Sequence, residues 1–221
     1  MELKKYKLGE IGKIVTGKTP STADEGNFDG EIPFITPSDI TNNAFMLNKA
    51  GRTISKKGFK SILSNTINGY SVLVGCIGSD MGNVGLTNIK CATNQQINSI
   101  TDIKDFCCPS YLYYRLMIMK GELRKMSNST TTPILPKSDF ENIAIYLPPI
   151  VVQQQIASVL SAIDEKIILN RAINQNLRVR REQRENLLSL CRADAVNGDV
   201  SRNLEATPDR SSRAAGVRRA A

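Results

Sequence analysis

The feature that most restricts the fold of this sequence is a stretch of 40 residues, 151–190, that contains neither glycine nor proline. Pro148 and Pro149 stand just before it and end the preceding regular structure, because proline lacks a backbone N–H and fixes φ. Such an uninterrupted run favours a single helix, which at 1.5 Å per residue would be ~60 Å long. That length exceeds what covers one small domain, so the sequence predicts a globular part followed by one long helix.

Apolar residues recur along this stretch at the 4-3-4 spacing of a heptad seam. The positions of this seam are Ile156, Leu160, Ile163, Ile167, Asn170, Asn174, Leu177, Arg181, Arg184 and Leu188. A helix folded back on its own domain is one explanation, and a coiled-coil arm is the one that the length favours. In a parallel homodimer Arg181 and Arg184 would face their own copies, whereas an antiparallel homodimer would bring them near the partner's Asp164 or Glu165. We therefore expect an antiparallel homodimer, with the two asparagines of the seam fixing its register.

The first part of the chain mixes short apolar runs with glycine and proline turn signals. The runs typical of strands are residues 11–15, 32–35, 70–77 and 143–147. One helix is expected over residues 111–126, where apolar residues recur at helical spacing and Pro109 suits the first turn. The predicted organisation is a mixed α/β globular domain at 1–147, a long helix at 148–190, and at 191–221 a turn with a tail that we expect to be disordered beyond about residue 201.

The chain is basic, with 29 Lys and Arg against 21 Asp and Glu and a formal net charge of +8. The surplus is spread along the chain: residues 1–150 carry 17 basic and 13 acidic side chains, and residues 151–190 and 191–221 each carry six and four. This distribution favours a folded basic face over a basic tail. Nucleic acid is the commonest partner of such a face, and an ordinary basic protein is the alternative that charge alone leaves open.

The sequence contains no histidine, and its five cysteines form no Cys-x-x-Cys pair. These facts exclude a histidine-bearing zinc site and histidine-based hydrolases, and they leave a four-cysteine site without its usual spacing. We therefore expect no metal and no cofactor. The scattered cysteines and an N-terminus without an apolar segment favour the cytoplasm. No apolar run reaches the ~20 residues that cross a bilayer, so no membrane association is expected.

One segment satisfies the phosphate-loop pattern G-x-x-x-x-G-K-[ST], namely residues 12–19. That chemistry needs a buried strand before the loop and a helix after it, so that backbone N–H groups face phosphate. Here residues 4–7 are Lys-Lys-Tyr-Lys, and Pro20 follows the pattern at once. The glycines at 75, 78, 82 and 85 do not have dinucleotide-binding spacing either, and they favour a strand-to-strand turn around residues 79–81. Nucleotide hydrolysis is therefore a minor alternative.

Short segments in a fixed order carry a resemblance to the specificity subunits of type I restriction–modification systems. These segments are residues 17–21, 32–40, 76–79, 92–98, 129–131, 137–140, 147–149, 153–157, 163–167, 169–171 and, faintly, 197–200. Each is weak alone, but together they cover roughly residues 6–200 in register. The resemblance implies that 1–147 is a DNA target recognition domain. A full-length specificity subunit carries two such domains and two helices, so this chain resembles a half-length form.

The resemblance also implies a division of labour. The specificity subunit binds double-stranded DNA at a bipartite site, while separate modification (methyltransferase) and restriction subunits methylate adenine and cleave. The sequence carries no adenine-methyltransferase, helicase or nuclease motif, so the chain is expected to be non-catalytic alone. Two alternatives stay open: a coiled-coil interaction protein without DNA affinity, and a P-loop NTPase.

DNA recognition needs basic groups at phosphates and polar groups at base edges. The candidate phosphate contacts are Lys18, Arg52, Lys56, Lys57 and Lys60, and a solvated charged surface is the alternative for each. The candidate base readers are Ser79, Asp80, Asn83, Asn94, Gln95 and Gln96. Motifs shared by subunits that read different sequences should serve a shared task. By that reasoning residues 94–96 and 36–39 are framework or turn elements, and the readers lie in other loops.

Overall fold

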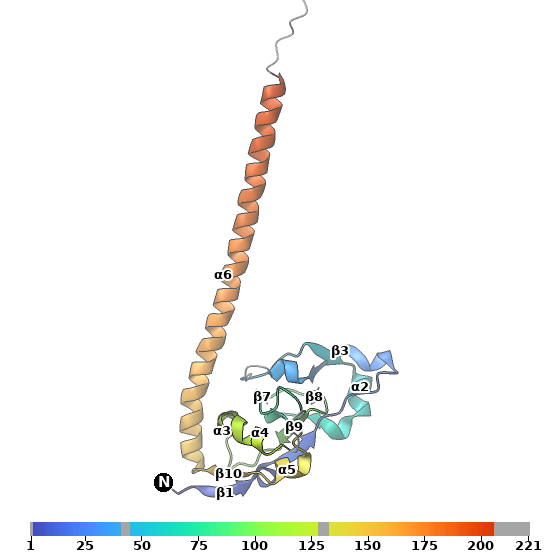
Figure 1. The fold of residues 1–221 in the computed structure, drawn as a ribbon, viewed down its shortest axis with the longest axis vertical. Coiled ribbons are helices and arrows are strands. Elements are labelled where there is room, and N and C mark those ends of the chain that lie inside the picture. The colour runs from blue at the N-terminus through green and yellow to red at the C-terminus, as the bar shows by residue number, and fades with distance from the viewer. Residues whose placement is uncertain (1, 41–44, 128–132, 206–221) are drawn as a thin grey trace, which may run out of the picture. The chain divides into compact units, whose positions relative to one another are not determined.

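The computed structural model describes residues 2–40, 45–127 and 133–205, and the side chains as far as residue 186. Its elements, in chain order, are β1 (Lys4–Lys7), α1 (Leu8–Ile11), β2 (Lys13–Thr16), η1 (Glu25–Asn27), β3 (Phe28–Ile35), η2 (Pro37–Ile40), β4 (Arg52–Ile54), α2 (Lys56–Ser61), η3 (Leu63–Asn65), β5 (Thr66–Ile67), β6 (Ser71–Gly75), β7 (Val84–Thr87), β8 (Cys91–Thr93), β9 (Ile97–Thr101), α3 (Pro109–Ile118), α4 (Lys120–Lys125), α5 (Lys137–Glu141), β10 (Ala144–Leu147) and α6 (Ile150–Glu205). This is a mixed α/β domain with one long C-terminal helix (Figure 1).

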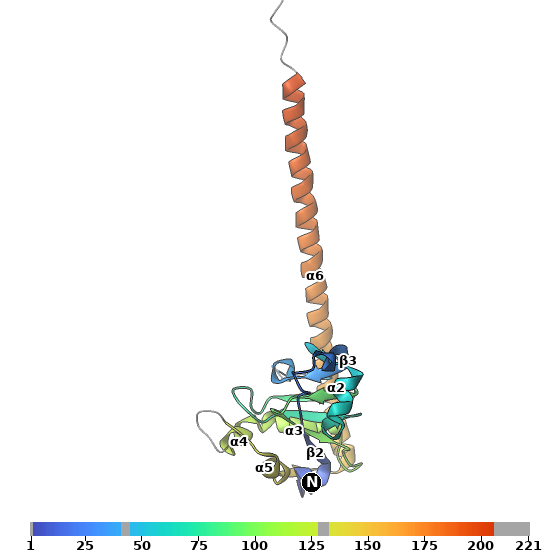
Figure 2. The same ribbon diagram turned by 90° about the vertical axis from the view of Figure 1, so that its right-hand side faces the viewer.

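Within the described residues the strands form three sheets, with the orders β1-β10, β2-β9-β6-β7 and β4-β3-β8-β5. Neighbouring strands run antiparallel except for β3 and β8, which are parallel. The sheet containing β3, with α2, lies toward one end of the globular unit, and β1, β10 and α5 lie toward the other (Figures 1 and 2). The first strand therefore pairs with the last one, and the two four-stranded sheets are built from the chain between them.

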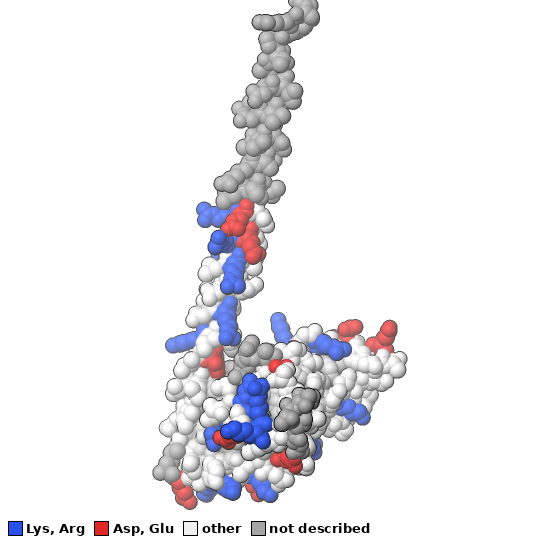
Figure 3. Space-filling model, in the orientation of Figure 1, with Lys and Arg blue, Asp and Glu red and all other residues white. Residues whose placement is uncertain are grey.

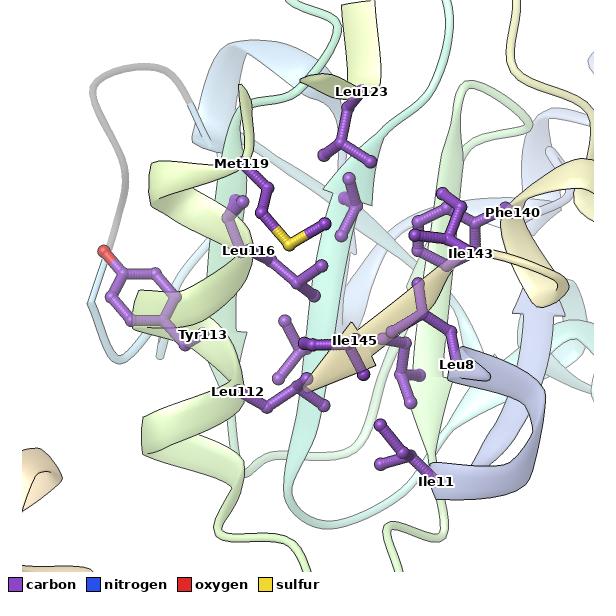
Figure 4. Packing of buried hydrophobic residues seen from close by; sticks show 14 of the residues in the cluster. Leu8, Ile11, Leu112, Tyr113, Leu116, Met119, Leu123, Phe140, Ile143 and Ile145 are labelled. Carbon is purple, nitrogen blue, oxygen red and sulfur yellow. The ribbon is translucent and has the colours of Figure 1, made fainter. Parts of the chain in front are cut away.

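The main core lies between the β2-β9-β6-β7 sheet and the helices beside it. Leu112 and Leu116 of α3 point toward the strands, with Ile145 of β10 between them and Leu8 of α1 (Figure 4). Each of these side chains is fully buried. Of two smaller clusters, one joins strands of both four-stranded sheets, as with Ile35 of β3 and Leu73 of β6, and the other packs Phe34 against α2. Because the apolar runs lie in both sheets, each sheet has its own buried face.

Three of the four predicted strands lie where apolar alternation suggested, as parts of β3, β6 and β10. The expectation for residues 11–15 was partly wrong, since Ile11 ends the one-turn helix α1 and only residues 13–15 belong to a strand. Glu10 explains the helical turn, because its carboxylate accepts a 2.7 Å hydrogen bond from the backbone N–H of Lys7. This is half of a capping box.

The predicted helix 111–126 is divided into α3 and α4 at Met119. Met119 has φ −82° and ψ 3°, and its N–H bonds to the carbonyl of Leu116 at 3.1 Å, as in a tightened last turn. Both Met119 and Leu123 remain buried against the core. The apolar spacing alone could not reveal this break, because both helices present the same pattern to the sheet.

The long helix α6 begins at Ile150, close to the predicted start, and continues to Glu205. The expected turn at residues 197–200 was wrong, because these residues lie inside the helix. A single glycine in a helix costs only about 1 kcal/mol relative to alanine, so Gly198 need not end it. The tail was expected to be disordered beyond about residue 201. Residues 201–205 are helical instead, and residues 206–221 lie outside the described residues.

The chain forms two structural units, Met1–Glu165 and Lys166–Ala221. The first turns of α6 belong to the first unit, where Gln153 and Ala157 are buried. Leu160 is partly buried and packs against the main core. Leu160 was expected on the dimer seam, but its side chain covers its own domain because it lies one helical turn beyond Ala157 on the same face.

Candidate nucleic-acid interface

The connection between β6 and β7, residues 76–83, carries three of the candidate readers. Two glycines, Gly78 and Gly82, have φ of 84° and 82°, in the left-handed region that glycine adopts without steric cost. The N–H of Met81 bonds to the carbonyl of Gly78 at 3.2 Å, and that of Asn83 to the carbonyl of Asp80 at 3.0 Å. The predicted turn around residues 79–81 is therefore confirmed, as an eight-residue connection closed by its own backbone.

Two basic side chains of α4 hold this connection in place. Arg124 donates through Nη2 to the Ser79 carbonyl at 2.6 Å and through Nε to the Met81 carbonyl at 3.1 Å. Lys120 donates through Nζ to the side-chain oxygen of Asn83, which is buried. The sequence did not single out Lys120 or Arg124, because its spacing could not show that α4 packs on this turn.

These contacts separate the three candidates in the connection. Asn83 uses its amide within the protein, since its Nδ2 also donates to Asp80 Oδ1 at 3.4 Å. Ser79 is exposed and Asp80 is half-buried, so both can still reach a ligand. Asn83 therefore belongs to the framework that supports the other two.

The other polar candidates, residues 94–96, form the turn between β8 and β9. Asn94 donates to Gln96 Oε1 at 2.9 Å and accepts from the Gln96 N–H at 3.1 Å. The Gln96 carbonyl accepts a 2.8 Å bond from the N–H of Cys76, which joins this turn to the β6–β7 connection. Gln95 is exposed, and its Oε1 accepts a 2.8 Å hydrogen bond from Thr19. Asn94 and Gln96 thus have the framework contacts expected of a shared motif.

The same holds for the segment 36–39. Asp39 Oδ2 accepts from the N–H and the hydroxyl of Thr36, both at 2.8 Å, and Oδ1 accepts from the Gly51 N–H at 2.8 Å. The carboxylate therefore closes its own turn and anchors the start of the segment leading to β4. This use of Asp39 agrees with the framework role that the sequence predicted.

The basic candidates fall into two places. Arg52 begins β4 and Lys56, Lys57 and Lys60 lie on α2, so four of them belong to one strand–helix segment, whereas Lys18 lies just after β2. All five side chains are exposed. Their surroundings differ, and this difference bears on which of them can bind phosphate.

Two of the α2 lysines already have acidic neighbours. Lys57 Nζ lies 2.6 Å from Asp24 Oδ2, and its hydrogen bond lowers the pKa of the Asp24 carboxyl. Lys56 Nζ lies 4.0 Å from Glu31, a loose pair. A further cation that the sequence did not single out, Lys90, stands 4.5 Å from the ring centroid of Phe59 of α2. On the face drawn in Figure 3, Lys and Arg side chains gather in a compact group near the middle of the globular unit, with an acidic side chain beside it, and other charged side chains are scattered toward the edges.

The phosphate-loop pattern at residues 12–19 does not form a phosphate loop, because half of it is a strand. Residues 13–16 are strand β2, paired with β9, and the N–H of Gly17 bonds to the Ile97 carbonyl at 3.0 Å. Backbone N–H groups engaged in a sheet cannot surround a phosphate. The pattern therefore occurs in a structural strand.

The four cysteines in the described side chains are free thiols. Burial raises the pKa of Cys76, Cys91 and Cys107 to about 12. Thiols of this kind are poor nucleophiles and poor metal ligands at neutral pH, because the thiolate is the reactive form. They behave as core side chains.

These features define a class of protein: a mixed α/β domain with supported polar turns and a basic strand–helix segment, followed by one long helix. Residues 1–179 match the family model described as the type I restriction modification DNA specificity domain. The chain therefore belongs to the type I restriction–modification DNA specificity family. None of the described helices combines the length and apolar character needed to cross a membrane.

Curated relatives and solved structures agree with this membership. The type I restriction enzyme MjaIX specificity subunit of Methanocaldococcus jannaschii is 30% identical over 174 residues, which are 77% of this chain and 40% of that protein. The HindI specificity subunit of Haemophilus influenzae is 31% identical over 176 residues, or 77% and 37%. The chain thus spans about two fifths of the length of these relatives.

Among solved structures, a chain of a type I R-M system shares the fold with a TM-score of 0.57 at 22% identity, covering 77% of this chain and 40% of that one. The HsdS subunit from Thermoanaerobacter tengcongensis gives a TM-score of 0.55 at 20% identity, covering 75% and 38%. At these identities the likeness concerns the fold alone.

Proposed function

We propose that this chain is a DNA-binding specificity module of a type I restriction–modification complex. The observation that carries the proposal is the match of residues 1–179 to the DNA specificity domain. In this role the globular domain binds double-stranded DNA, in the cytoplasm, and selects the site at which the complex acts. The formal net charge of +8 supports an acidic partner.

We also propose that the chain is non-catalytic alone and directs modification and restriction subunits to their site. The relatives are named as specificity subunits. Residues 13–16 of the phosphate-loop pattern form a strand, which argues against nucleotide hydrolysis. Methylation and cleavage then depend on the partner subunits, and no metal or cofactor is required of this chain.

Within the domain, the main proposed phosphate contacts are Lys60 and Lys18. Both are exposed and have no acidic partner within 4 Å among the described residues. Lys56 and Lys57 contribute less, because Glu31 and Asp24 offset part of their charge. The exposed or half-exposed Ser79, Asp80 and Gln95 are the proposed polar contacts of the β6–β7 and β8–β9 turns. Asn83, Asn94 and Gln96 support these turns from within.

We propose that two copies pair through α6 in antiparallel orientation. Ile163, Ile167 and Leu177 are 52%, 41% and 57% exposed, and they share one seam of the helix. Large apolar side chains in water favour association, because burying each one contributes ~1.5–3 kcal/mol. With Leu160 turned toward its own domain, the seam consists of the other predicted positions up to Arg184, and the side chain of Leu188 lies outside the described residues.

An antiparallel pair also accounts for the length of the relatives. Two chains that each span about two fifths of a relative would together supply two recognition domains and two helices. Two-fold symmetry then requires an inverted-repeat DNA site with a fixed spacer between its two halves. The length of this spacer is to be compared with the ~34–36 Å that one turn of DNA spans. The helices set this spacer.

The experiment combines binding and modification. The purified chain is tested by gel shift on mixed duplex DNA at several salt concentrations, and then co-expressed with a cognate modification subunit in a host whose methylome is sequenced. Salt-dependent binding, and adenine methylation at a bipartite site that requires this chain, are expected. Failure to bind DNA at low salt, with an intact dimer, would instead identify a coiled-coil interaction protein. Nucleotide binding by the chain alone would support the NTPase alternative.

A further inference from the structure

An open depression of about 400 Å³ lies where β3 and β4 meet, at the edge of the β4-β3-β8-β5 sheet. The residues that line it are Thr22, Glu25, Phe28, Asp29, Arg52 and Thr53. It therefore combines one guanidinium, two carboxylates, two hydroxyls and an aromatic ring. Neither the shared motifs nor the polar turns described above contribute to it.

The guanidinium of Arg52 is held by two aromatic rings. Its Cζ lies 5.6 Å from the ring centroid of Phe28 and 6.0 Å from that of Phe34, which is buried. Stacking of this kind restricts an otherwise flexible side chain and leaves the N–H groups at its edge free to bond in their plane. The described residues give Arg52 no carboxylate within 4 Å, in contrast to Lys57. Arg52 is thus oriented but not neutralised.

The backbone beside it is irregular. The pairing of β3 with β4 shifts register between Phe28 and Ile32, and Asp29 has a φ of 55°. Bulges re-aim side chains, and a non-glycine residue in the left-handed region costs free energy that the surroundings must offset. In a regular strand the successive side chains of Phe28 and Asp29 would point to opposite faces. Both residues line the depression, at the point where the register shifts.

The charges distinguish two uses of Arg52. A phosphate contact would be weakened by Glu25 and Asp29, because two carboxylates repel an anion. A base pair presents both signs of group: guanine offers O6 and N7 acceptors that match arginine, and cytosine offers an N4 amino donor that matches a carboxylate. We propose that this depression reads a G·C pair in the major groove, with Arg52 on guanine and Asp29 or Glu25 beside cytosine.

The sequence context supports this assignment. The segments that carry the resemblance to specificity subunits do not include the residues of the depression. Of these residues, 22–31 lie between the segments 17–21 and 32–40, and 52–53 come after both. A residue that determines specificity must be free to differ among such proteins, whereas the turns at 36–39 and 94–96 are used for framework contacts. The inference rests on the proposed function and assigns a base to one part of that site.

The test is selection from a library of randomised duplex DNA by the full-length chain with its cognate modification subunit. Wild type is compared with Arg52→Lys, which keeps the charge, and Arg52→Met, which keeps apolar contact with the rings. Lys60→Ala is the matched phosphate-type control. Arg52→Met should lose preference for G·C at one position by roughly 5- to 150-fold, with the other positions unchanged. Arg52→Lys should lose less of this preference, because lysine can also bond to guanine O6 and N7. Lys60→Ala should weaken binding to all sequences alike.

The outcomes separate the two proposals. A wild-type complex that selects no sequence overturns the proposed function itself. A wild-type complex that selects a site, with Arg52→Lys and Arg52→Met selecting the same site at uniformly lower affinity, overturns only the inference and makes Arg52 a phosphate contact. Arg52 is exposed, so both variants should retain the wild-type melting temperature. The sequence that Arg52→Met selects decides the matter, because lysine can itself bond to guanine. Asp29→Asn, which tolerates the same φ, should relax the same position.

Discussion

The hydroxyl of Tyr114 on α3 donates a 2.6 Å hydrogen bond to Asp164 Oδ2 on α6, joining residues 50 positions apart. Burial of Tyr114 and its bond to this carboxylate raise the pKa of the phenol, so at neutral pH the group remains a donor. The contact lies one helical turn beyond Leu160, on the same face of α6. It fixes the beginning of the helix to the domain from which it starts.

Removing that hydroxyl tests how much the contact contributes. Tyr114→Phe should lower the free energy of unfolding by about 1–2 kcal/mol, because the carboxylate loses a charge-assisted bond while the ring packing is kept. Urea denaturation measures the change. In a double-mutant cycle with Asp164→Asn, the second substitution should cost less once the hydroxyl is gone. Additive effects would mean that the two groups are not energetically coupled.

Replacing Gln153 should lower the free energy of unfolding more than replacing Tyr114. It is 1% exposed, its Nε2 donates to the carbonyls of Phe106 at 3.0 Å and Pro148 at 2.8 Å, and its Oε1 accepts from the Cys108 N–H at 2.9 Å. Gln153→Leu would leave these buried backbone groups without partners, so we expect a loss of about 2–4 kcal/mol in unfolding free energy. The matched control is Gln154→Leu at an exposed position, which should change stability by less than about 0.5 kcal/mol. Equal effects of the two variants would contradict this account.

The three consecutive glutamines at 153–155 show what the sequence could and could not reveal. Its pattern predicted a helix there, but identical side chains carry no sign of which one faces the domain. That depends on the rotation of α6 against Phe106 and Cys108, which is a tertiary contact. For the same reason the sequence could not predict the break at Met119 or the hydrogen bonds of Arg124. Strands in which buried apolar residues alternate with others, such as β10, could be located from this two-residue period alone.

The candidate site was predictable to a similar degree. Framework roles were expected for the shared motifs, and Asp39 and Asn94 do form hydrogen bonds within turns, as polar residues next to glycine and proline often do. The surroundings of Arg52 were not predictable, because Phe28 and Phe34 reach it only after β3 pairs with β4. Charge alone made Lys57 equal to Lys60, although one faces Asp24 at 2.6 Å.

The dimer seam can be tested with charged substitutions. Ile163→Glu together with Ile167→Glu should convert a dimer into monomers at micromolar concentration, because each carboxylate would have to be buried among apolar side chains. Size-exclusion chromatography with light scattering measures the mass. Ile168→Glu is the control: Ile168 is 46% exposed, but at 100° per residue it lies on another face. A wild-type chain that is itself monomeric, without the modification subunit, would contradict the dimer.

The α2 lysines make a paired test of phosphate binding. Lys60→Ala should weaken DNA binding and reduce the slope of log K against log salt by about 1, as expected for one lost phosphate contact. Lys57→Ala should have a smaller effect, because the Lys57 ammonium is already bonded to Asp24 at 2.6 Å and is less available to a phosphate. Fluorescence anisotropy across a salt series gives both slopes. A larger change for Lys57→Ala than for Lys60→Ala would reverse the assignment.

The buried thiols predict a labelling pattern. With a pKa of about 12, Cys76, Cys91 and Cys107 would have a thiolate fraction of roughly 10⁻⁴ at pH 8, besides being shielded from reagents. Alkylation of the folded chain at pH 8 should leave these three unmodified while the partly exposed Cys108 reacts, as read by peptide mass spectrometry. In denaturant all four should react. Early labelling of Cys76 would show that the core opens under native conditions.

The pairing of β1 with β10 has a consequence for how the chain is made. Lys4 pairs with Leu147, so the first strand stays without its partner until nearly the whole domain has been synthesised. Closing a sheet across so many residues demands long-range contacts, which slow folding. Helix α6 follows β10 directly, so it leaves the ribosome last, after every strand of the domain. If two copies pair through α6, as proposed, their helices therefore meet only after all strands of both domains are available to fold.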